Sequence, residues 1–226
     1  MRPKPSTDEI YHIFNRGVEK RIVFLTDADK KRFAQNLYIF NDSALIINNN
    51  RPDLREVRLL SEKREKLVEI LAFALMPNHY HLMVKQIAEN GITEFMRKIG
   101  TGYTNYFNTK YQRVGPLFQG KYKAALLENQ RHFMYLPHYI HANPLDMGFP
   151  AWRKRRLKHV ASAIKFLESY PWSSYAEYTG LPSKLPRLIE PNFVNEFFES
   201  PQQYKKDFQE WLLEKNLTDI GDIALE

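Results

Sequence analysis

Apolar side chains recur with two different spacings along the first 150 residues, and the spacing distinguishes strands from helices. Alternation of apolar and polar residues, or a short apolar run between turn residues, predicts strands at residues 9–15, 67–76, 79–85 and 121–127. Apolar residues three or four apart predict helices at residues 28–40, 92–111 and 130–142. We expect Asp27 to cap the first helix, and Pro77-Asn78 to turn the chain between the two middle strands.

The order of these elements is strand, helix, strand, strand, helix, strand, helix. Antiparallel pairing of the strands, with the helices on one face, predicts an α+β fold of the ferredoxin-like or RRM-like kind. The polar residues 44–66 are expected to form an inserted loop. We expect a first domain of residues 1–150, followed by a basic, mostly helical C-terminal extension of residues 151–226 in which Phe193 to Lys215 is helical.

Composition narrows the class of protein. Of the 226 residues, 43% are apolar and 14% aromatic, which excludes global disorder. The absence of cysteine excludes disulfides, thiolate metal sites and a cysteine nucleophile. The polar start and the short longest apolar run, residues 70–76, lead us to expect a cytoplasmic protein with no membrane contact. The formal charge of +7 suits a polyanionic partner but does not identify one.

Two pairs of residues have spacings that suit chemistry. His79 and His81 lie two apart on a predicted strand, so both imidazoles point to one face, as a divalent metal requires. Tyr139 and Asn143 lie four apart on a predicted helix and share one face of it. Each pair also has a structural interpretation: two half-exposed strand histidines, and a core tyrosine with a helix C-cap before Pro144.

Together, the two pairs make a self-consistent site. His79, His81 and Asn143 would offer two nitrogens and one oxygen with positions left open for phosphate, which favours Mg²⁺ or Mn²⁺ over a closed structural zinc site. The hydroxyl of Tyr139 would attack a phosphodiester in line. Four other tyrosines compete with it on composition alone, namely Tyr103, Tyr106, Tyr111 and Tyr135.

Five ordered segments resemble one known family. Residues 75–82, Leu-Met-Pro-Asn-His-Tyr-His-Leu, resemble the HUH motif (histidine, bulky residue, histidine) of single-strand transposases. The other segments are residues 11–17, 115–120, 139–144 and 172–175. Together they resemble the REP-associated tyrosine transposases, a branch of the HUH single-strand DNA transposases with a single catalytic tyrosine, and they span most of the chain.

The resemblance implies a metal-dependent tyrosine DNA strand transferase or nuclease. Tyr139 would be the nucleophile, and His79, His81 and Asn143 would ligate the metal. Family members act on single-stranded DNA with imperfect palindromes that form hairpins, through a 5′-phosphotyrosine and without ATP. The chain likewise shows no glycine-rich nucleotide-binding loop. It departs from the family pattern at Pro137, close before the nucleophile, and at Lys121, where arginine is usual. A monomer and a homodimer both remain open.

Basic and aromatic residues supply candidate DNA contacts. The expected phosphate contacts are Arg16, Lys121, Lys123, Arg153, Lys154, Arg155 and Arg156, although residues 153–156 could also be a solvated connector. Phe118, Tyr122 and Trp152 could stack bases or pack in the core. Two other hypotheses stay open: a hairpin-binding module that does not cut nucleic acid, and a metallophosphodiesterase that uses water and does not need Tyr139.

Overall fold

The computed structural model describes residues 5–43, 64–154, 156–185, 188–190, 193 and 196–214. Its sheet has four antiparallel strands in the order β2-β3-β1-β4, and all four were predicted. The strands are β1 (Ile10–Arg16), β2 (Val68–Met76), β3 (His79–Gln86) and β4 (Lys123–Leu126). Helix α1 (Asp27–Ile39) joins β1 to β2, and α3 (Gly91–Lys110) joins β3 to β4. This order and connectivity are ferredoxin-like, as expected.

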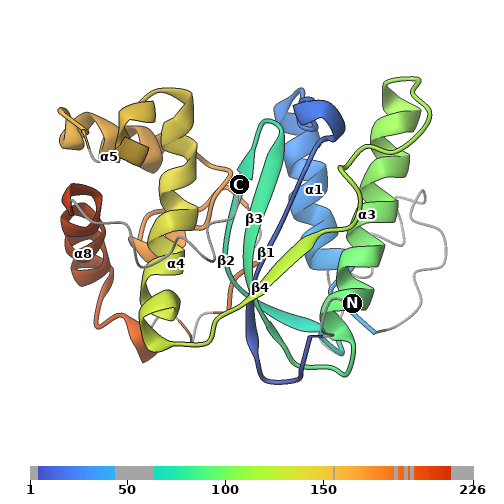
Figure 1. The fold of residues 1–226 in the computed structure, drawn as a ribbon, viewed down its shortest axis with the longest axis horizontal. Helices are drawn as coiled ribbons and strands as arrows, with labels where there is room; N and C mark the ends of the chain where they lie inside the picture. The colour runs from blue at the N-terminus through green and yellow to red at the C-terminus, as the bar shows by residue number, and fades with distance from the viewer. Residues whose placement is uncertain are drawn as a thin grey trace.

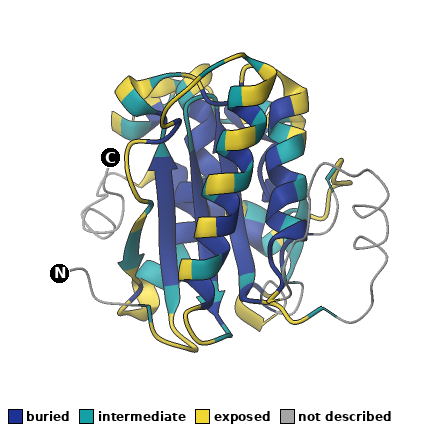
Figure 2. Ribbon diagram, turned by 90° about the vertical axis from the view of Figure 1, so that its right-hand side faces the viewer, coloured by how far each residue is buried: buried dark blue, intermediate teal, exposed yellow. Residues whose placement is uncertain are grey.

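Helices cover both faces of the sheet, so the expectation of helices on one face is wrong. Helices α1 and α3 cover one face, and α4 (Gln130–Ala142) lies on the other (Figure 1). The side chains of β3 show the two layers, because Tyr80 packs on Phe33 of α1 whereas His81 packs on Tyr139 of α4. The cause lies in β2, whose almost continuous apolar run leaves neither face polar enough for water. Figure 2 shows the strands buried behind helices whose outer sides are exposed.

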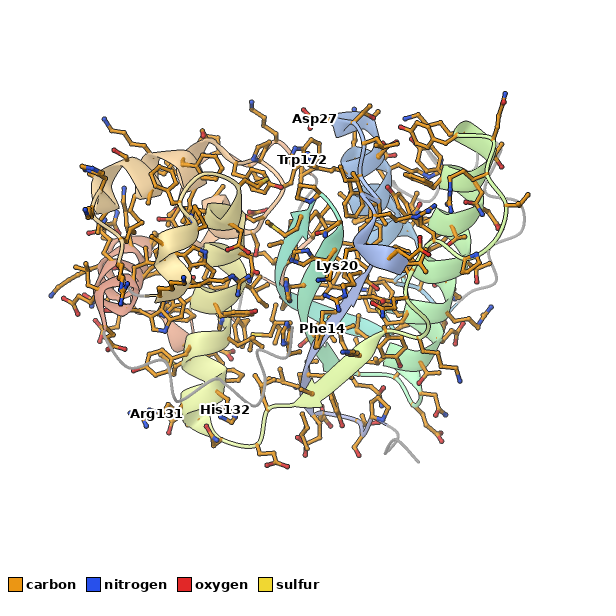
Figure 3. The ribbon with its side chains drawn as sticks, turned by 45° about the horizontal axis from the view of Figure 1, so that its top comes forward. Phe14, Lys20, Asp27, Arg131, His132 and Trp172 are labelled. Carbon is orange, nitrogen blue, oxygen red and sulfur yellow. The ribbon has the colours of Figure 1, made fainter. Side chains whose placement is uncertain are left out.

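The start of α1 differs from the prediction by one residue. Thr26, not Asp27, is the N-cap, and the carboxylate of Asp29 accepts a hydrogen bond from the Thr26 backbone N–H at 2.9 Å. Asp27 is the first helical residue, and its carboxylate accepts a hydrogen bond from the indole of Trp172 at 3.1 Å (Figure 3). The tryptophan therefore ties the C-terminal part of the chain to α1.

The C-terminal part packs on α4 and along the edge of the sheet. Its elements are η2 (Asn143–Met147), η3 (Pro150–Lys154), α5 (Val160–Ser169), α6 (Tyr175–Tyr178) and α8 (Pro201–Leu213). Residues 172–174 run beside β2, where the Leu75 N–H donates to the Trp172 carbonyl at 2.9 Å. Side chains from before and after residue 150 share one hydrophobic core, and the division into two domains at that residue stays a prediction.

The predicted helix from Phe193 to Lys215 is interrupted. The chain leaves the helical conformation at residues 198–200, and α8 begins at Pro201 with Ser200 as its N-cap, whose hydroxyl accepts from the Gln203 N–H at 3.0 Å. Lys215 and most of the expected loop, residues 44–63, lie outside the described residues. None of the helices within the described ranges is long and apolar enough to cross a membrane.

Candidate functional site

The two histidines of the predicted metal pair lie at the start of β3, just after the hairpin turn. They point to the face of the sheet that α4 covers, and their ring centroids are 5.0 Å apart with the rings nearly perpendicular. His81 is buried, whereas His79 is half-buried. In the β1–β3 ladder, Phe14 lies opposite His81 and Arg16 opposite His79. Period-two alternation thus gives the shared direction that the sequence predicted.

A hydrogen bond at the Nδ1 of each histidine fixes the ring orientation. His79 Nδ1 lies 2.6 Å from Asn78 Oδ1, and Asn78 Nδ2 donates to the Lys20 carbonyl, so the amide can only accept from the ring. His79 therefore carries its proton on Nδ1, and its Nε2 holds the lone pair. His81 Nδ1 lies 2.9 Å from Nε2 of His12, a wholly buried residue of β1.

Sequence reasoning did not assign a role to His12. The residue stands in one of the segments that carry the family resemblance, residues 11–17. Strand alternation places it on the same face as Phe14 and Arg16, which was the signal available. Its contact with His81 depends on pairing between positions 69 residues apart, and local patterns do not specify such pairing.

Helix α4 packs over the histidine pair and brings Tyr139 close to it. The Tyr139 ring is 5.7 Å from that of His81 and 6.1 Å from that of His12, in both cases edge to face. The helix runs from Gln130 to Ala142 with Pro137 inside it, so this proline does not start a new helix before Tyr139. The side chain of Tyr139 is buried.

Asn143 ends α4 and is engaged on both sides of its amide. Its Nδ2 donates to the Tyr139 carbonyl at 2.8 Å, and its Oδ1 accepts from Arg153 Nη2 at 2.9 Å. The residue is thus a helix C-cap, as the structural interpretation had it, and lies on the same helix face as Tyr139. The oxygen has two lone pairs, and Arg153 uses one of them.

Arg153 is part of a side-chain cluster rather than a flexible connector. Its guanidinium binds both carboxylate oxygens of Asp146, with the shortest contact 2.6 Å, and lies 5.8 Å from the centre of the Tyr139 ring. Trp152, which is also buried, donates its indole N–H to Asp146 at 2.7 Å. Lys154 and Arg156 are exposed, and Arg155 lies outside the described residues.

A cavity of about 520 Å³ opens beside the histidines. Two of the predicted DNA contacts, Arg16 and Lys123, line this cavity together with Asp146. The Arg16 Nε donates to Gln119 at 3.0 Å, and the Lys123 ammonium lies 5.7 Å from the ring of Phe14, which is labelled in Figure 3. The cavity thus joins basic side chains to the histidine pair.

The remaining predicted contacts lie elsewhere. Lys121 is exposed, and the cavity lining does not include it. Phe118 packs against Tyr80 in the core with ring centroids 5.7 Å apart, so it is a core residue in this structure, as is Trp152. Tyr122 is half-buried.

Three of the four competing tyrosines lie on the side of the sheet away from the histidine pair. Tyr103, Tyr106 and Tyr111 belong to the α3 side of the sheet, where the Tyr103 hydroxyl donates to the Val23 carbonyl and the other two donate to Asp29. Burial raises the pKa of Tyr103 well above its usual range. The ring of Tyr135, one turn before Tyr139, lies 6.3 Å from that of His138.

The histidines that flank Tyr139 in sequence also point away from it. Burial lowers the pKa of His138 to about 3, and its ring lies among the aromatic side chains of α8. Burial, with a smaller contribution from His138, lowers the pKa of His141 as well. His141 is bonded to the hydroxyls of Tyr204 and Ser174. Neither ring is therefore a general base for Tyr139.

The donor set suits a divalent first-row metal. The described residues contain no cluster of three or more His, Cys, Asp or Glu placed to hold a metal ion, so a metal at this site needs an amide, water or phosphate oxygen beside the two imidazoles. His79 fits this role, because its Nδ1 bond to Asn78 makes Nε2 the donor atom. The oxygen donor predicted from α4 is Asn143 Oδ1, which accepts a hydrogen bond from Arg153.

A family model matches part of the chain, and a solved structure is similar to it at low sequence identity. Residues 43–143, a little under half of the chain, match the family described as "Transposase IS200 like", and this range includes His79, His81, Tyr139 and Asn143. No curated protein matches the chain. One similar solved structure is described as "Structure of the REP associates tyrosine transposase bound to a REP hairpin", with 13% identity, a TM-score of 0.49 and coverage of 84% of this chain and 89% of that chain.

Proposed function

Because residues 43–143 match the IS200-like transposase family, we propose that this chain cleaves and rejoins single-stranded DNA at hairpin-forming sites through a Tyr139 nucleophile. The observation that carries the proposal is the convergence of Tyr139, from α4, on the histidine pair of β3, with 5.7 Å between the rings of Tyr139 and His81. A buried tyrosine against two oriented imidazoles is unnecessary for a module that only binds DNA.

In the proposed reaction, Tyr139 Oη attacks the scissile phosphorus and forms a phosphotyrosine with the 5′-phosphate of the DNA fragment on the 3′ side of the cut. The bond from phosphorus to the 3′-oxygen breaks, the phenolic proton passes to solvent, and the leaving oxygen takes up a proton as a 3′-hydroxyl. Attack of a 3′-hydroxyl on the phosphotyrosine reverses these steps and rejoins a strand. The energy of the phosphodiester is conserved in the intermediate, so no ATP is needed.

His79 and His81 would hold Mg²⁺ or Mn²⁺ through Nε2, and Asn143 would offer an oxygen. When bound, the metal polarises the scissile phosphate and stabilises the charge that develops on it. Arg16 and Lys123, in the cavity beside the histidines, would bind phosphates next to the cleaved one. The exposed Lys121, Lys154 and Arg156, which do not line the cavity, would contact other phosphates of the hairpin. Arg155, which lies outside the described residues, stays a predicted phosphate contact.

The test is covalent capture. The protein is incubated with Mn²⁺ and labelled single-stranded DNA hairpins that differ in the sequence next to the base of the stem. The products are then separated on a denaturing gel. We expect a DNA adduct with the wild-type protein that is lost in Tyr139→Phe and reduced at least about 100-fold in His79→Ala, as metal-dependent catalysis requires. The matched control, Tyr135→Phe one helical turn earlier, should keep the adduct.

The other hypotheses give different results. Hairpin binding without an adduct would mean a binding module. Cleavage that persists in Tyr139→Phe would mean that water, and not the tyrosine, is the nucleophile. Either result overturns the proposal.

A further inference from the structure

His12 is buried at the centre of the candidate site and contacts both of its reactive parts. Its Nε2 is 2.9 Å from Nδ1 of His81, and the two rings stack with centroids 5.1 Å apart and planes 20° apart. The Tyr139 ring meets it edge to face at 6.1 Å. His12 is 0% exposed and lies on β1, outside the residues that match the transposase family.

We propose that His12 is a positioning residue that fixes the tautomer of His81. Its Nε2 accepts the Nδ1–H of His81, so that His81 presents Nε2 to the metal. The inference rests on the proposed function, since it concerns how the same metal site is prepared.

The argument starts from the number of protons on a neutral imidazole. Each ring carries one N–H and one lone pair, so in the bond between His12 and His81 one ring donates and the other accepts. If His81 donates, its lone pair is on Nε2; if His12 donates, the lone pair of His81 is used in the bond and its Nε2 carries a proton, which excludes a metal. Only the first arrangement is compatible with ligation.

His79 also has a hydrogen-bond partner at Nδ1, and this partner allows only one tautomer of the ring. Asn78 Oδ1 can only accept, so His79 has a single possible tautomer. In metal sites, a ligating histidine regularly donates its other ring N–H to an acceptor, and loss of that acceptor weakens metal binding about 10- to 100-fold. His12 gives His81 what Asn78 gives His79.

A direct ligand role for His12 fits the geometry less well. Its Nε2 already faces Nδ1 of His81 at hydrogen-bond distance in a nearly parallel stack. Within the described ranges, His12, His79 and His81 do not form a group placed to hold a metal. The remaining alternative is that His12 only packs against its neighbours. A phenylalanine at this position tests that alternative, because its ring packs but has no lone pair to accept a hydrogen bond.

The experiment measures Mn²⁺ affinity by electron paramagnetic resonance, without DNA, in the wild-type protein and in two variants. His12→Phe keeps the ring and removes the acceptor, and we expect it to weaken Mn²⁺ binding about 10- to 100-fold. In His12→Gln, the amide oxygen lies near the position of Nε2, and we expect affinity within about threefold of wild type because the acceptor is restored. Equal affinity of wild type and His12→Phe, or equal losses in both variants, would overturn the inference.

A second measurement does not depend on the His12 variants being folded. Nitrogen-15 NMR of histidine rings in the wild-type protein, assigned with His81→Ala, should show His81 protonated on Nδ1 and not on Nε2. The opposite tautomer would overturn the inference even if the protein binds metal. Absence of Mn²⁺ binding by the wild-type protein would instead remove the proposed metal site itself, and with it the role of His12.

Discussion

At the scale of single residues, Arg153 stabilises the fold through contacts with neighbouring side chains. It stands in a basic run that suggested phosphate contacts, yet its guanidinium is held by Asp146 and Asn143 and lies over the rings of Trp152 and Tyr139. Planar, two-point recognition of a carboxylate is specific to arginine. The cluster joins η3 to the end of α4, so it holds the C-cap of the helix that carries Tyr139, the proposed nucleophile.

Replacement of Arg153 by glutamine should therefore destabilise the protein. We expect a loss of about 1–2 kcal/mol in the free energy of unfolding, because a charge-assisted pair and the bond to Asn143 disappear while Asp146 stays partly buried. Urea denaturation measures the change. The matched control is Lys154→Gln, an exposed neighbour, which should change stability by less than about 0.5 kcal/mol. Equal effects of the two variants would contradict the structural role of Arg153.

The sequence predicted residues of the site where local periodicity determines direction. His79 and His81 share a face because a strand alternates, and Tyr139 and Asn143 share a face because a helix turns every 3.6 residues. It missed His12 and the Arg153–Asp146 pair. These contacts depend on strand register and on the fold of the chain after α4, which no local pattern specifies.

At the scale of elements, α4 is held by buried polar bonds on the side away from Tyr139. His141 bonds through Nδ1 to the Tyr204 hydroxyl of α8 at 2.6 Å, and through Nε2 to Ser174 at 2.7 Å. Ser174 in turn accepts from the Phe73 N–H of β2. One histidine therefore links α4 to the C-terminal helix and to the edge of the sheet, which fixes the rotation of α4 and the direction of Tyr139.

The buried histidines of α4 should make the fold acid-sensitive. Burial lowers the pKa of His138 to about 3, below its ordinary 6.5, and within the described residues neither of its ring nitrogens has a hydrogen-bond partner. Below pH 6.5 His138 binds a proton in the unfolded chain but stays neutral in the folded chain. The contribution of neutral His138 to folding stability is therefore complete above pH 6.5. It falls by about 1.4 kcal/mol per pH unit as the pH drops toward 3. His141 acts in the same direction.

His138→Phe tests this directly, because it keeps an aromatic ring and removes the titration. Urea denaturation between pH 6.5 and 5, above the range of most carboxylates, should show a clearly smaller loss of stability in the variant than in the wild type. Replacement of the exposed His159 by glutamine is the control and should leave the slope unchanged. A wild-type slope in His138→Phe would mean that His138 is accessible to protons in the folded state.

Sequence patterns predicted the described strands and helices of the first 150 residues well, but they did not predict the residues at which α1 and α8 begin. Helix α1 begins at Asp27, the residue predicted to be its cap, because Thr26 and Asp29 together form the capping pair. The interruption before α8 had a signal in the chain, since Ser200-Pro201 is a typical N-cap followed by proline at the first helical position.

At the scale of the whole molecule, the site exists only because two layers meet. The sheet supplies His12, His79 and His81, and the α4 layer supplies Tyr139 from a position 58 residues after His81. Helices on one face alone, as the element order suggested, would have left the histidine face open to solvent. The apolar character of β2 on both faces makes the second layer necessary, and the C-terminal helices complete it.

The measurement that tests the central claim most directly is the identity of the residue that becomes linked to DNA. The adduct formed with Mn²⁺ and a hairpin substrate is digested with nuclease and protease, and the modified peptide is sequenced by mass spectrometry. The account predicts a nucleotide on Tyr139, joined through the 5′-phosphate of the DNA fragment on the 3′ side of the cut. A phosphate on Tyr135 or any other residue would contradict it.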